Sequence, residues 1–358
     1  MKELKLMKGN EAVAEGAIRC GVDGYFGYPI TPQSEILEHL MAEKPYEKTG
    51  MVVLQAESEV ASINMVYGGA AMGKKVMTSS SSPGVSLMQE GLSYMAGAEL
   101  PGLVVNVVRG GPGLGTIQPS QADYFQTTKG GGHGDYRLIT LAPASVQEMY
   151  DFVELAFDLS FKYRNPAMIL SDGIIGQVME KVEVGDYKPR WTDEYIRKSF
   201  PWALTGKTAS RPHNIVTSLE LEASRQEQVN LRLQKKYKEC EENEVRYETI
   251  QCDDADYFIV AYGSSSRISQ KAIQLARESG LKVGLIRPIT LWPFPSKAIR
   301  EITARAKGIL CVEMSAGQMI EDVKLAVECK IPVVHFGRLG GIIPSPAEVV
   351  EAIQSKLM

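Results

Sequence analysis

Charged residues follow two apolar runs of this sequence, at positions where a side chain could take part in chemistry. Glu57 and Glu59 follow the run Met51–Gln55, and Arg109 follows the run Leu103–Val108 and opens a glycine-rich loop. A carboxylate can place a proton on a reacting group, and an arginine can hold a carboxylate in a bidentate pair. Both residue types also have ordinary explanations, because acidic residues favour the first turn of any helix and exposed arginines often form surface salt bridges.

Hydroxyl-rich motifs follow two further apolar runs. In Tyr28–Pro32 (YPITP) two prolines fix the backbone around Thr31, which could equally be the N-cap of a helix that begins at the following proline. The segment Thr78–Ser86 (TSSSSPGVS) opens a helical pattern, and such a turn either binds an anion through its backbone N–H groups or simply caps the helix. Farther along, the glycine-rich loop Lys129–Asp135 contains His133, which is either a functional or an ordinary surface histidine.

The elements that would position these motifs alternate between strands and helices. Segments with apolar residues at helical spacing, such as Ser145–Phe161, separate apolar runs of strand length. These runs are Tyr25–Tyr28, Met51–Gln55, Lys75–Thr78, Leu103–Val108, Arg137–Leu141 and Ala167–Ser171. The alternation predicts an α/β fold with a mainly parallel sheet that is covered by helices on both faces. Ligands of such sheets bind at the carboxyl ends of the strands, which is where the motifs above fall.

A change of pattern divides the chain into three parts. Between residues 186 and 250 the alternation stops, and the polar run Ser218–Glu248 predicts an exposed helix. The alternation resumes with the runs Tyr257–Tyr262, Lys282–Arg287, Gly308–Glu313 and Pro332–Phe336. We therefore expect an α/β domain over residues 1–185, an irregular and helical linker over 186–250, and a smaller α/β domain over 251–358.

The composition of the chain disfavours several classes of function. The 358 residues are 44% hydrophobic and 23% charged, which is typical of a soluble globular protein. A net charge of -4 without a basic face is not typical of a nucleic-acid-binding protein. No apolar stretch is long enough for a membrane span, and the charged N-terminal segment does not resemble a secretory signal. Five scattered cysteines without a C-x-x-C pair indicate a reduced, cytoplasmic protein that holds no iron–sulfur cluster or zinc by itself.

Three of the motifs occur together in an order that resembles a known family. Tyr28–Pro32, Arg109–Pro112 and Gly131–Asp135 resemble the alpha subunits of 2-oxoacid:ferredoxin oxidoreductases, most closely the 2-oxoisovalerate (branched-chain) type, over essentially the whole chain. The resemblance implies a parallel-sheet domain of the kind that binds the pyrimidine ring of thiamine diphosphate, followed by a smaller α/β domain like the C-terminal domain of transketolases. It also implies oxidative decarboxylation of a 2-oxoacid with coenzyme A to acyl-CoA and CO2, with electrons passed to ferredoxin.

The resemblance assigns a role in cofactor activation to Glu59. In such domains a glutamate begins a helix nine residues before a glycine, a spacing that Glu59 meets with Gly68 and that Glu57 does not meet. Its carboxylate would hydrogen-bond N1′ of the aminopyrimidine, and the tautomer that this favours takes the proton from the thiazolium carbon. Pro29, Ile30 and Ser81 would contact the cofactor.

The resemblance gives Thr31 and Arg109 the task of binding the substrate carboxylate. The segment Ser80–Gly84 (SSSPG) looks like the T-S-x-P-G segment of thiamine enzymes but departs from it at the first position. Three alternatives stay open: the same enzyme acting on 2-oxoglutarate, a non-catalytic scaffold subunit, and a self-contained thiamine transferase or decarboxylase.

A missing motif predicts partner chains. Thiamine enzymes bind the diphosphate through Mg²⁺ with a G-D-G motif and a downstream asparagine, and the nearest strings here, Ser171–Gly173 and Gly134–Tyr136, lack that asparagine. By the resemblance, the diphosphate and Mg²⁺ would therefore lie on a beta subunit. Iron–sulfur clusters would lie on partner chains as well, among them a small ferredoxin-like subunit and a gamma subunit. This chain alone should be inactive.

Overall fold

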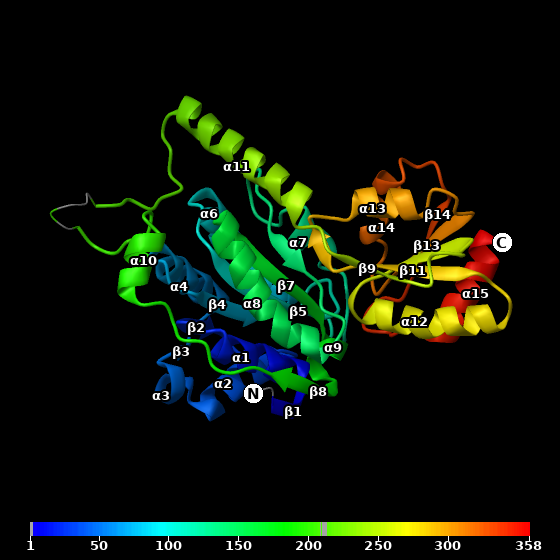
Figure 1. The fold of residues 1–358 in the computed structure, drawn as a ribbon, viewed down its shortest axis with the longest axis horizontal. Helices are drawn as coiled ribbons and strands as arrows, with labels where there is room; N and C mark the ends of the chain where they lie inside the picture. The colour runs from blue at the N-terminus through cyan, green and yellow to red at the C-terminus, as the bar shows by residue number, and fades with distance from the viewer. Residues whose placement is uncertain (1–2, 208, 210–212) are drawn as a thin grey trace.

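The computed structural model describes residues 3–207, 209 and 213–358. The sequence predictions for the N-terminal segment and the linker lie partly outside the described residues, at positions 1–2, 208 and 210–212. Two α/β units lie side by side along the longest axis of the molecule, with the N-terminus in the larger and the C-terminus in the smaller (Figure 1). No helix of the described chain combines the length and the apolar character that a membrane crossing needs.

The larger unit contains a seven-stranded sheet with the strand order β12-β6-β7-β5-β4-β2-β3. Six of its strands form a parallel array, and β12 pairs with β6 in the antiparallel direction. The strands are β2 (Gly24–Gly27), β3 (Val52–Gln55), β4 (Val76–Ser80), β5 (Gly102–Val108), β6 (Ile139–Leu141), β7 (Pro166–Asp172) and β12 (Thr290–Trp292). All seven residues of β5 and of β7 are buried, as expected of parallel strands with helices on both faces. The predicted fold class is confirmed.

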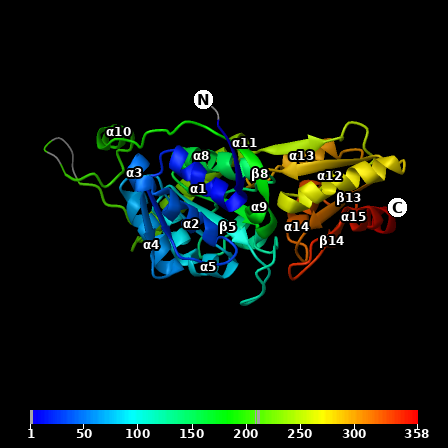
Figure 2. The ribbon, with the colours of Figure 1, turned by 90° about the horizontal axis from the view of Figure 1, so that it is seen from below.

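Helices cover both faces of this sheet (Figure 2). One layer consists of α1 (Gly9–Arg19), α2 (Ser34–Glu43) and α8 (Val146–Tyr163). The other layer contains α4 (Glu59–Ala71), α5 (Ser82–Leu87) and α6 (Gln89–Gly97). Side-chain caps define two of the helix starts, since Ser58 accepts a hydrogen bond from Ala61 N at 3.2 Å and Ser145 accepts one from Glu148 N at 3.1 Å.

The smaller unit has a five-stranded sheet with the order β14-β13-β10-β11-β9. Its parallel strands are β10 (Tyr257–Val260), β11 (Val283–Pro288), β13 (Gly308–Glu313) and β14 (Val333–Gly337), and β9 (Tyr247–Ile250) is an antiparallel edge strand. The helices α12 (Gly263–Glu278) and α15 (Pro346–Leu357) pack together on one face, and α13 (Ser296–Ile302) and α14 (Met319–Ala326) pack together on the other.

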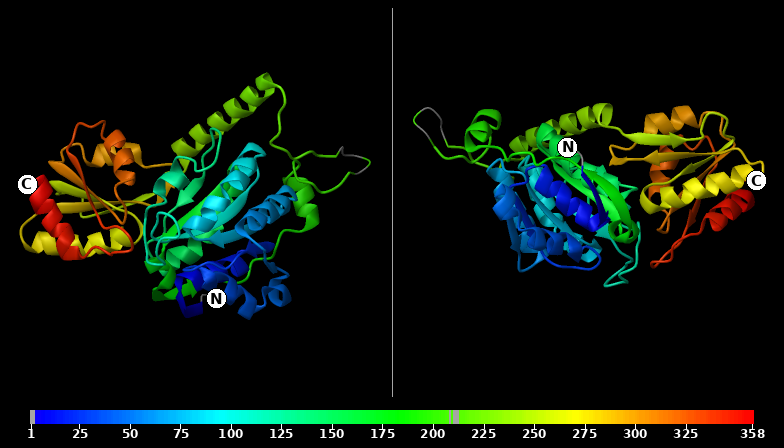
Figure 3. Two further views of the ribbon diagram at one scale, coloured as in Figure 1. Left: turned by 180° about the vertical axis from the view of Figure 1, so that it is seen from behind. Right: turned by 60° about the horizontal axis from the view of Figure 1, so that its bottom comes forward.

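The long helix α11 (Ala223–Asn243) connects the two units (Figure 3). It is the helix expected within Ser218–Glu248 but is shorter at both ends, and it buries only a narrow stripe formed by Leu233, Tyr237 and Cys240. The connection is reinforced by β12, which comes from the C-terminal part of the chain but pairs with β6 of the larger sheet. The remaining elements are α3 (Pro45–Thr49), α7 (Tyr124–Thr128), α9 (Gly173–Gln177), α10 (Asp193–Ser199) and the antiparallel pair β1 (Glu3–Lys8) with β8 (Met179–Val184).

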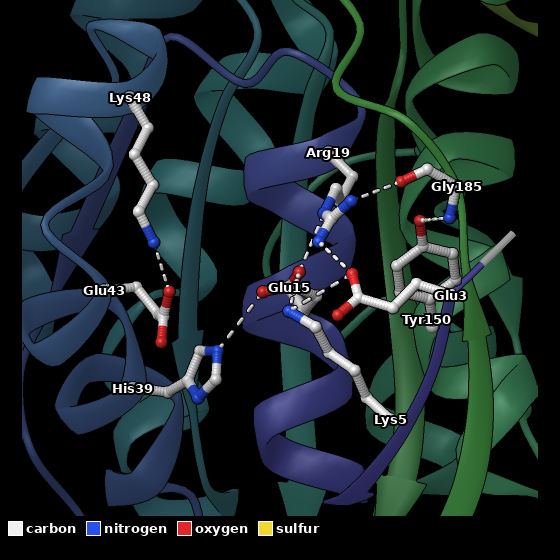
Figure 4. Close-up of polar contacts among 9 residues, drawn as sticks. All are labelled: Glu3, Lys5, Glu15, Arg19, His39, Glu43, Lys48, Tyr150 and Gly185. Atoms are coloured by element: carbon white, nitrogen blue, oxygen red, sulfur yellow. Dashed lines mark hydrogen bonds and ion pairs between the residues drawn. The ribbon is translucent and has the colours of Figure 1, made fainter. Parts of the chain in front are cut away.

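Helix α1 is anchored by a buried carboxylate that binds several cations (Figure 4). Glu15 is only 1% exposed and accepts hydrogen bonds from Arg19 at 2.7 Å and Lys5 at 3.0 Å. Its second oxygen lies 3.5 Å from His39 Nε2 on α2. These four residues, called the Glu15 cluster below, tie β1, α1 and α2 together on the face of the sheet opposite α4.

Candidate active site

The motifs singled out in the sequence follow four strands that are neighbours in space. The strand order places β5, β4, β2 and β3 next to one another. Because all four run parallel, their carboxyl ends meet at one edge of the sheet. Arg109 follows β5, Ser81 follows β4, the turn Tyr28–Pro32 follows β2, and α4 with Glu59 follows β3. The sheet topology thus brings together residues up to 81 positions apart in the chain.

Glu59 is a buried carboxylate packed against the turn that follows β4. Its side chain is 6% exposed, whereas Glu57 is exposed. A Cβ atom placed on Gly84 would lie 2.6 Å from Glu59 Oε1 and 2.0 Å from Ser80 Oγ, so any side chain at position 84 would displace these two groups. Among the residues that the structure describes, no hydrogen bond or ion pair reaches the Glu59 carboxylate. Both of its oxygens are therefore free to accept hydrogen bonds from a ligand.

Three hydroxyl groups of β4 and of the turn that follows it are buried without partners. Thr78 Oγ1, Ser80 Oγ and Ser81 Oγ are shielded from solvent and make no hydrogen bond in the structure. Ser81 occupies the N-cap position of α5, but its side chain does not cap the helix. The serine-rich turn thus opens a helix as expected, but the helix start is not capped by the Ser81 hydroxyl. Leaving a buried hydroxyl unpaired costs about 1–3 kcal/mol, and three in one place suit a ligand that supplies the missing partners.

A chain of hydrogen bonds holds the Tyr28–Pro32 turn in place. The hydroxyls of Tyr25 and Ser79 are 2.6 Å apart, Ser79 donates to Gln33 Oε1 at 2.6 Å, and Gln33 Nε2 donates to Tyr28 O at 3.2 Å. The carbonyl of Pro32 accepts further bonds from side chains of α1 and α9. Because Gln33, and not Thr31, is the N-cap residue of α2, the interpretation of Thr31 as a helix cap is wrong.

The turn leaves three predicted site residues accessible. Thr31 and Pro29 are exposed, and Ile30 is half-buried. The turn therefore presents the Thr31 hydroxyl and two apolar side chains at the carboxyl edge of the sheet.

Arg109 lies directly beside this turn. Its guanidinium donates from Nη1 to Thr31 O at 3.0 Å and from Nη2 to Leu114 O at 3.2 Å, while its Nε atom is buried without a partner. The side chain is 7% exposed and forms no ion pair within the described chain, so the surface salt-bridge interpretation is wrong. A guanidinium bonded only to neutral carbonyls keeps its full charge for an anion.

The structure adds site-supporting residues that the sequence predictions missed. Ser82 N donates to Asn106 Oδ1 at 3.1 Å, and Asn106 Nδ2 donates to Asp123 Oδ2 at 3.0 Å. The Ser82 hydroxyl accepts a bond from Arg109 N at 3.1 Å. Burial raises the pKa of Asp123 although Ser82 and Asn106 act in the opposite direction. The signal in the sequence was the single Asn106 within the otherwise apolar strand LVVNVV.

His133 lies on the surface, away from these contacts. Its ring is exposed and forms an edge contact with Tyr94 of α6, with 6.0 Å between the centroids. Its backbone carbonyl accepts a hydrogen bond from Ser93 of the same helix at 2.6 Å. Both contacts fit the interpretation of His133 as a surface histidine.

The Ser171–Gly173 string takes part in local structure through the carboxylate of Asp172. Asp172 Oδ1 accepts hydrogen bonds from the backbone N–H groups of Ile174 and Ile175 and from the Ser264 hydroxyl, and Oδ2 accepts one from Ser264 N. Within residues 3–207, 209 and 213–358, no group of three or more His, Cys, Asp or Glu side chains is arranged to hold a metal ion.

Comparison with known proteins decides the family. The family model described as "Pyruvate flavodoxin/ferredoxin oxidoreductase, thiamine diP-bdg" matches residues 15–248, and "Pyruvate:ferredoxin oxidoreductase core domain II" matches residues 255–349. The chain belongs to the 2-oxoacid:ferredoxin oxidoreductase family. Within this family it corresponds to an alpha subunit of a multi-subunit oxidoreductase, and its N-terminal domain is of the thiamine-diphosphate-binding type. The unpaired carboxylate of Glu59 and the unpaired hydroxyls fit such a polar, nitrogen-rich cofactor.

Individual relatives extend the comparison over the full chain. The "Ketoisovalerate oxidoreductase subunit VorB" of Methanothermobacter thermautotrophicus is 49% identical over 352 residues, which are 98% of this chain and 97% of that protein. The "2-oxoglutarate synthase subunit KorA" of Archaeoglobus fulgidus is 36% identical over 99% of this chain and 100% of its own length.

Solved structures agree with the family and the fold. A 2-oxoglutarate:ferredoxin oxidoreductase from Magnetococcus marinus, solved with 2-oxoglutarate, coenzyme A and succinyl-CoA, superimposes with a TM-score of 0.84 at 27% identity. The match covers 100% of this chain and 66% of that one. A split-gene transketolase, at a TM-score of 0.62 and 13% identity, shows that the fold is shared with transketolases, as expected.

Proposed function

We propose that this chain is the alpha subunit of an enzyme that oxidatively decarboxylates 2-oxoisovalerate with coenzyme A to acyl-CoA and CO2 and passes the electrons to ferredoxin. The observation that carries the proposal is the buried, unpartnered carboxylate of Glu59 beside Gly84. The substrate is taken from two relatives at 49% and 50% identity, which are both named ketoisovalerate oxidoreductase subunits. 2-Oxoglutarate is the second candidate, because relatives at 34–36% identity are named 2-oxoglutarate synthase subunits.

Glu59 is the proposed catalytic residue of this chain. Thiamine diphosphate, when bound, supplies the nucleophilic carbon and the electron sink for decarboxylation. The Glu59 carboxylate accepts a hydrogen bond at N1′ of the aminopyrimidine and holds the proton there, a role supported by its burial and its free oxygens. Pro29 and Ile30 offer apolar surface to the cofactor, and Ser81 offers a buried hydroxyl without a competing partner.

Arg109 and Thr31 are the proposed carboxylate-binding pair. Their direct contact, with Arg109 Nη1 3.0 Å from Thr31 O, supports a joint role in holding the carboxylate of a 2-oxoacid while its carbon–carbon bond breaks. Arg109 Nε has no protein partner to lose when a substrate binds. The positive charge and the hydroxyl together fix the orientation of the reacting carbon.

A beta subunit that holds the diphosphate and Mg²⁺ is proposed to cover the outer face of α4. Support comes from a stripe on that helix formed by Val60, Asn64, Gly68 and Met72, all of which are exposed. Gly68 has no atom within 4 Å of its hypothetical Cβ position, so another chain could approach closely there. Iron–sulfur clusters on a small ferredoxin-like and a gamma subunit, and a cytoplasmic location, stay predictions from the resemblance and from the cysteine pattern.

The test is an assay of the complex isolated with this chain from its native cells. Viologen reduction without oxygen is measured with coenzyme A and each of several 2-oxoacids. Rapid reduction with 2-oxoisovalerate supports the reaction and the substrate. Rapid reduction with 2-oxoglutarate alone keeps the reaction and corrects the substrate. No reduction by an intact complex that carries thiamine and clusters contradicts the proposal and favours a scaffold subunit.

A further inference from the structure

The smaller sheet has a topology that commonly forms a ligand site. Strand β10 lies between β11 and β13. The helix after β10 (α12) covers one face of the sheet, and the helix after β13 (α14) covers the other. In open α/β sheets a crevice forms outside the carboxyl ends of two such strands, and ligands usually bind there.

This crevice is filled by Gln121, a residue of the N-terminal domain. Its Nε2 donates to Tyr262 O, after β10, at 2.9 Å, and its Oε1 accepts from Ser265 Oγ at 2.6 Å. Oε1 also accepts from Met314 N, after β13, at 3.0 Å, and Gln121 N donates to Met314 O at 2.9 Å. Gln121 is 2% exposed. The crevice therefore holds a side chain of the same protein where related folds hold a diffusible ligand.

The N-terminus of α14, a second position suited to an anion, is occupied in the same way. Glu313 is fully buried at the end of β13. Its carboxylate accepts bonds from the backbone N–H groups of Gln318 at 3.0 Å, Met319 at 2.8 Å and Ile320 at 3.1 Å. Both positions are thus saturated by protein groups, and the crevice serves to bind the loop that carries Gln121.

That loop begins at Arg109. Its base is closed by hydrogen bonds from Gly110 N to Gln118 O and from Thr116 N to Gly110 O, each 2.9 Å long, and by a bridge between Arg109 and Pro119. Two residues after Pro119, Gln121 enters the C-terminal domain. Because Pro119 pairs with Arg109 and lies only two residues before Gln121, a shift of Gln121 should also move the backbone of Arg109.

The C-terminal domain contacts the loop at a second point. A Cβ atom on Gly110 would lie 3.3 Å from the carbonyl carbon of Gly340, and one on Gly341 would lie 2.3 Å from Gln118 Cβ. A cavity of about 950 Å³ lies beside this contact, lined by Gly110–Gly113 of the loop and by Met314, Ala316 and Gly340 of the C-terminal domain.

We propose that Gln121 is a positioning residue through which the C-terminal domain holds the Arg109 loop in the conformation that binds the substrate carboxylate. The inference rests on the proposed function, because it assumes that Arg109 binds this carboxylate. The C-terminal domain then influences substrate affinity without contacting the substrate.

The test uses Gln121→Ala in the complete enzyme complex. We expect the KM for the 2-oxoacid to rise about tenfold, with kcat reduced no more than about threefold and the KM for coenzyme A unchanged, because only carboxylate binding is loosened. Hydrogen exchange of the backbone amides in residues 110–118 should become faster. If the alanine variant does not assemble, Gln121→Glu keeps acceptors for Ser265 and Met314 but loses the donor to Tyr262, and the same changes should appear to a smaller degree.

Ser264→Ala is the matched control. It removes another buried side-chain bond between the domains, from Ser264 Oγ to Asp172 at 2.6 Å, which does not involve the loop. We expect a loss of stability similar to that of Gln121→Ala, but neither a change in KM nor faster exchange in residues 110–118. Equal behaviour of the two variants would show that Gln121 has a structural role only, and unchanged exchange in Gln121→Ala overturns the proposal irrespective of activity.

Arg109→Lys, measured in parallel, separates this inference from the proposed function. If Gln121→Ala leaves the KM unchanged while Arg109→Lys raises it, the positioning role is wrong and the role of Arg109 stands. If both variants leave the KM unchanged, the assignment of Arg109 falls as well.

Discussion

Two buried glutamates on opposite faces of the same sheet differ in how their charge is compensated. Glu15 is 1% exposed and contacts Arg19, Lys5 and His39 (Figure 4). Glu59 is 6% exposed and has no hydrogen-bond partner in the described chain. Both side chains extend from helices that pack on the large sheet. The difference therefore lies in the neighbouring groups and not in the depth of burial.

The comparison teaches how a structural carboxylate can be told from a functional one. Burial raises the pKa of Glu15, but hydrogen bonds from His39, Lys5 and Arg19 outweigh burial and hold that pKa at about 2. The Glu15 cluster thus compensates its own desolvation and stabilises the fold. Glu59 has no such partners in the described chain, so its carboxylate is free to accept a hydrogen bond from a ligand.

The largest effect is expected for Glu59→Gln. The amide cannot hold the proton at N1′, so oxoacid-dependent viologen reduction by the complex should fall by a factor of about 10² to 10⁴. The stability of the subunit should stay the same or rise, because an uncharged group is cheaper to bury. Activity and thermal unfolding are measured on the same preparations.

Glu57→Gln is the matched control for this prediction. Glu57 lies two residues away and is exposed, so its variant should keep full activity. Full activity in Glu59→Gln, or an equal loss in both variants, would remove Glu59 from the catalytic role.

Glu15→Gln is expected to lower the stability of the subunit and to leave its activity unchanged, the reverse of Glu59→Gln. Loss of the carboxylate takes from the buried Arg19 and the half-buried Lys5 their shared buried counter-charge and should lower the free energy of unfolding by about 2–3 kcal/mol at pH 7. The activity of correctly assembled complex should not change. Since the folded pKa of Glu15, about 2, lies below its ordinary value of 4.5, this stabilisation is complete above about pH 4.5 and is lost as the pH falls towards 2. Urea unfolding at several pH values checks this window.

Glu43→Gln provides the comparison on the same face of the sheet. Glu43 pairs with Lys48 (Figure 4), but both side chains are partly open to solvent, at 34% and 41% exposure. Exposed pairs contribute little, so this variant should unfold almost like the wild type. A Glu15→Gln variant as stable as Glu43→Gln would show that the Glu15 cluster does not support the fold.

The sequence predicted the strands that are buried on both faces, because such strands appear in the sequence as uninterrupted apolar runs. The runs Leu103–Val108 and Ala167–Ser171 are apolar throughout and became the central strands β5 and β7. The strands β1, β8, β9 and β12 were missed because they are short or half-exposed and pair with segments far away in the chain. The three-part division at residues 185 and 250 stays a prediction.

The sequence could predict those site residues that directly follow a recognisable strand, but not the contacts between segments far apart in the chain. The positions of Glu59 and Arg109 after strands located both at the correct edge of the sheet. Whether Thr31 caps a helix depends on where α2 begins, which the sequence left open. The contacts of Gln121 could not be predicted, because its partners Ser265 and Met314 lie 144 and 193 residues away.

The smallest effect is expected for Ser81→Ala. This variant asks whether a buried hydroxyl without a protein partner binds the cofactor, as is proposed for the carboxylate of Glu59. The Ser81 hydroxyl is buried, occupies a helix N-cap position and makes no hydrogen bond. Its removal should leave the stability of the free subunit unchanged or raise it by up to about 1 kcal/mol, and should weaken thiamine diphosphate binding by the complex a few-fold. Thermal unfolding and cofactor titration measure the two effects.

Ser145→Ala decides how this result is interpreted. Ser145 is also an N-cap serine, but its hydroxyl accepts a bond from Glu148 N at 3.1 Å, so its loss should cost about 1 kcal/mol of stability and leave cofactor binding unchanged. If Ser81→Ala destabilises the subunit as much as Ser145→Ala does, Ser81 is an ordinary cap. If Ser81→Ala weakens only cofactor binding and Ser145→Ala weakens only stability, the Ser81 hydroxyl binds the cofactor, as is proposed for the Glu59 carboxylate.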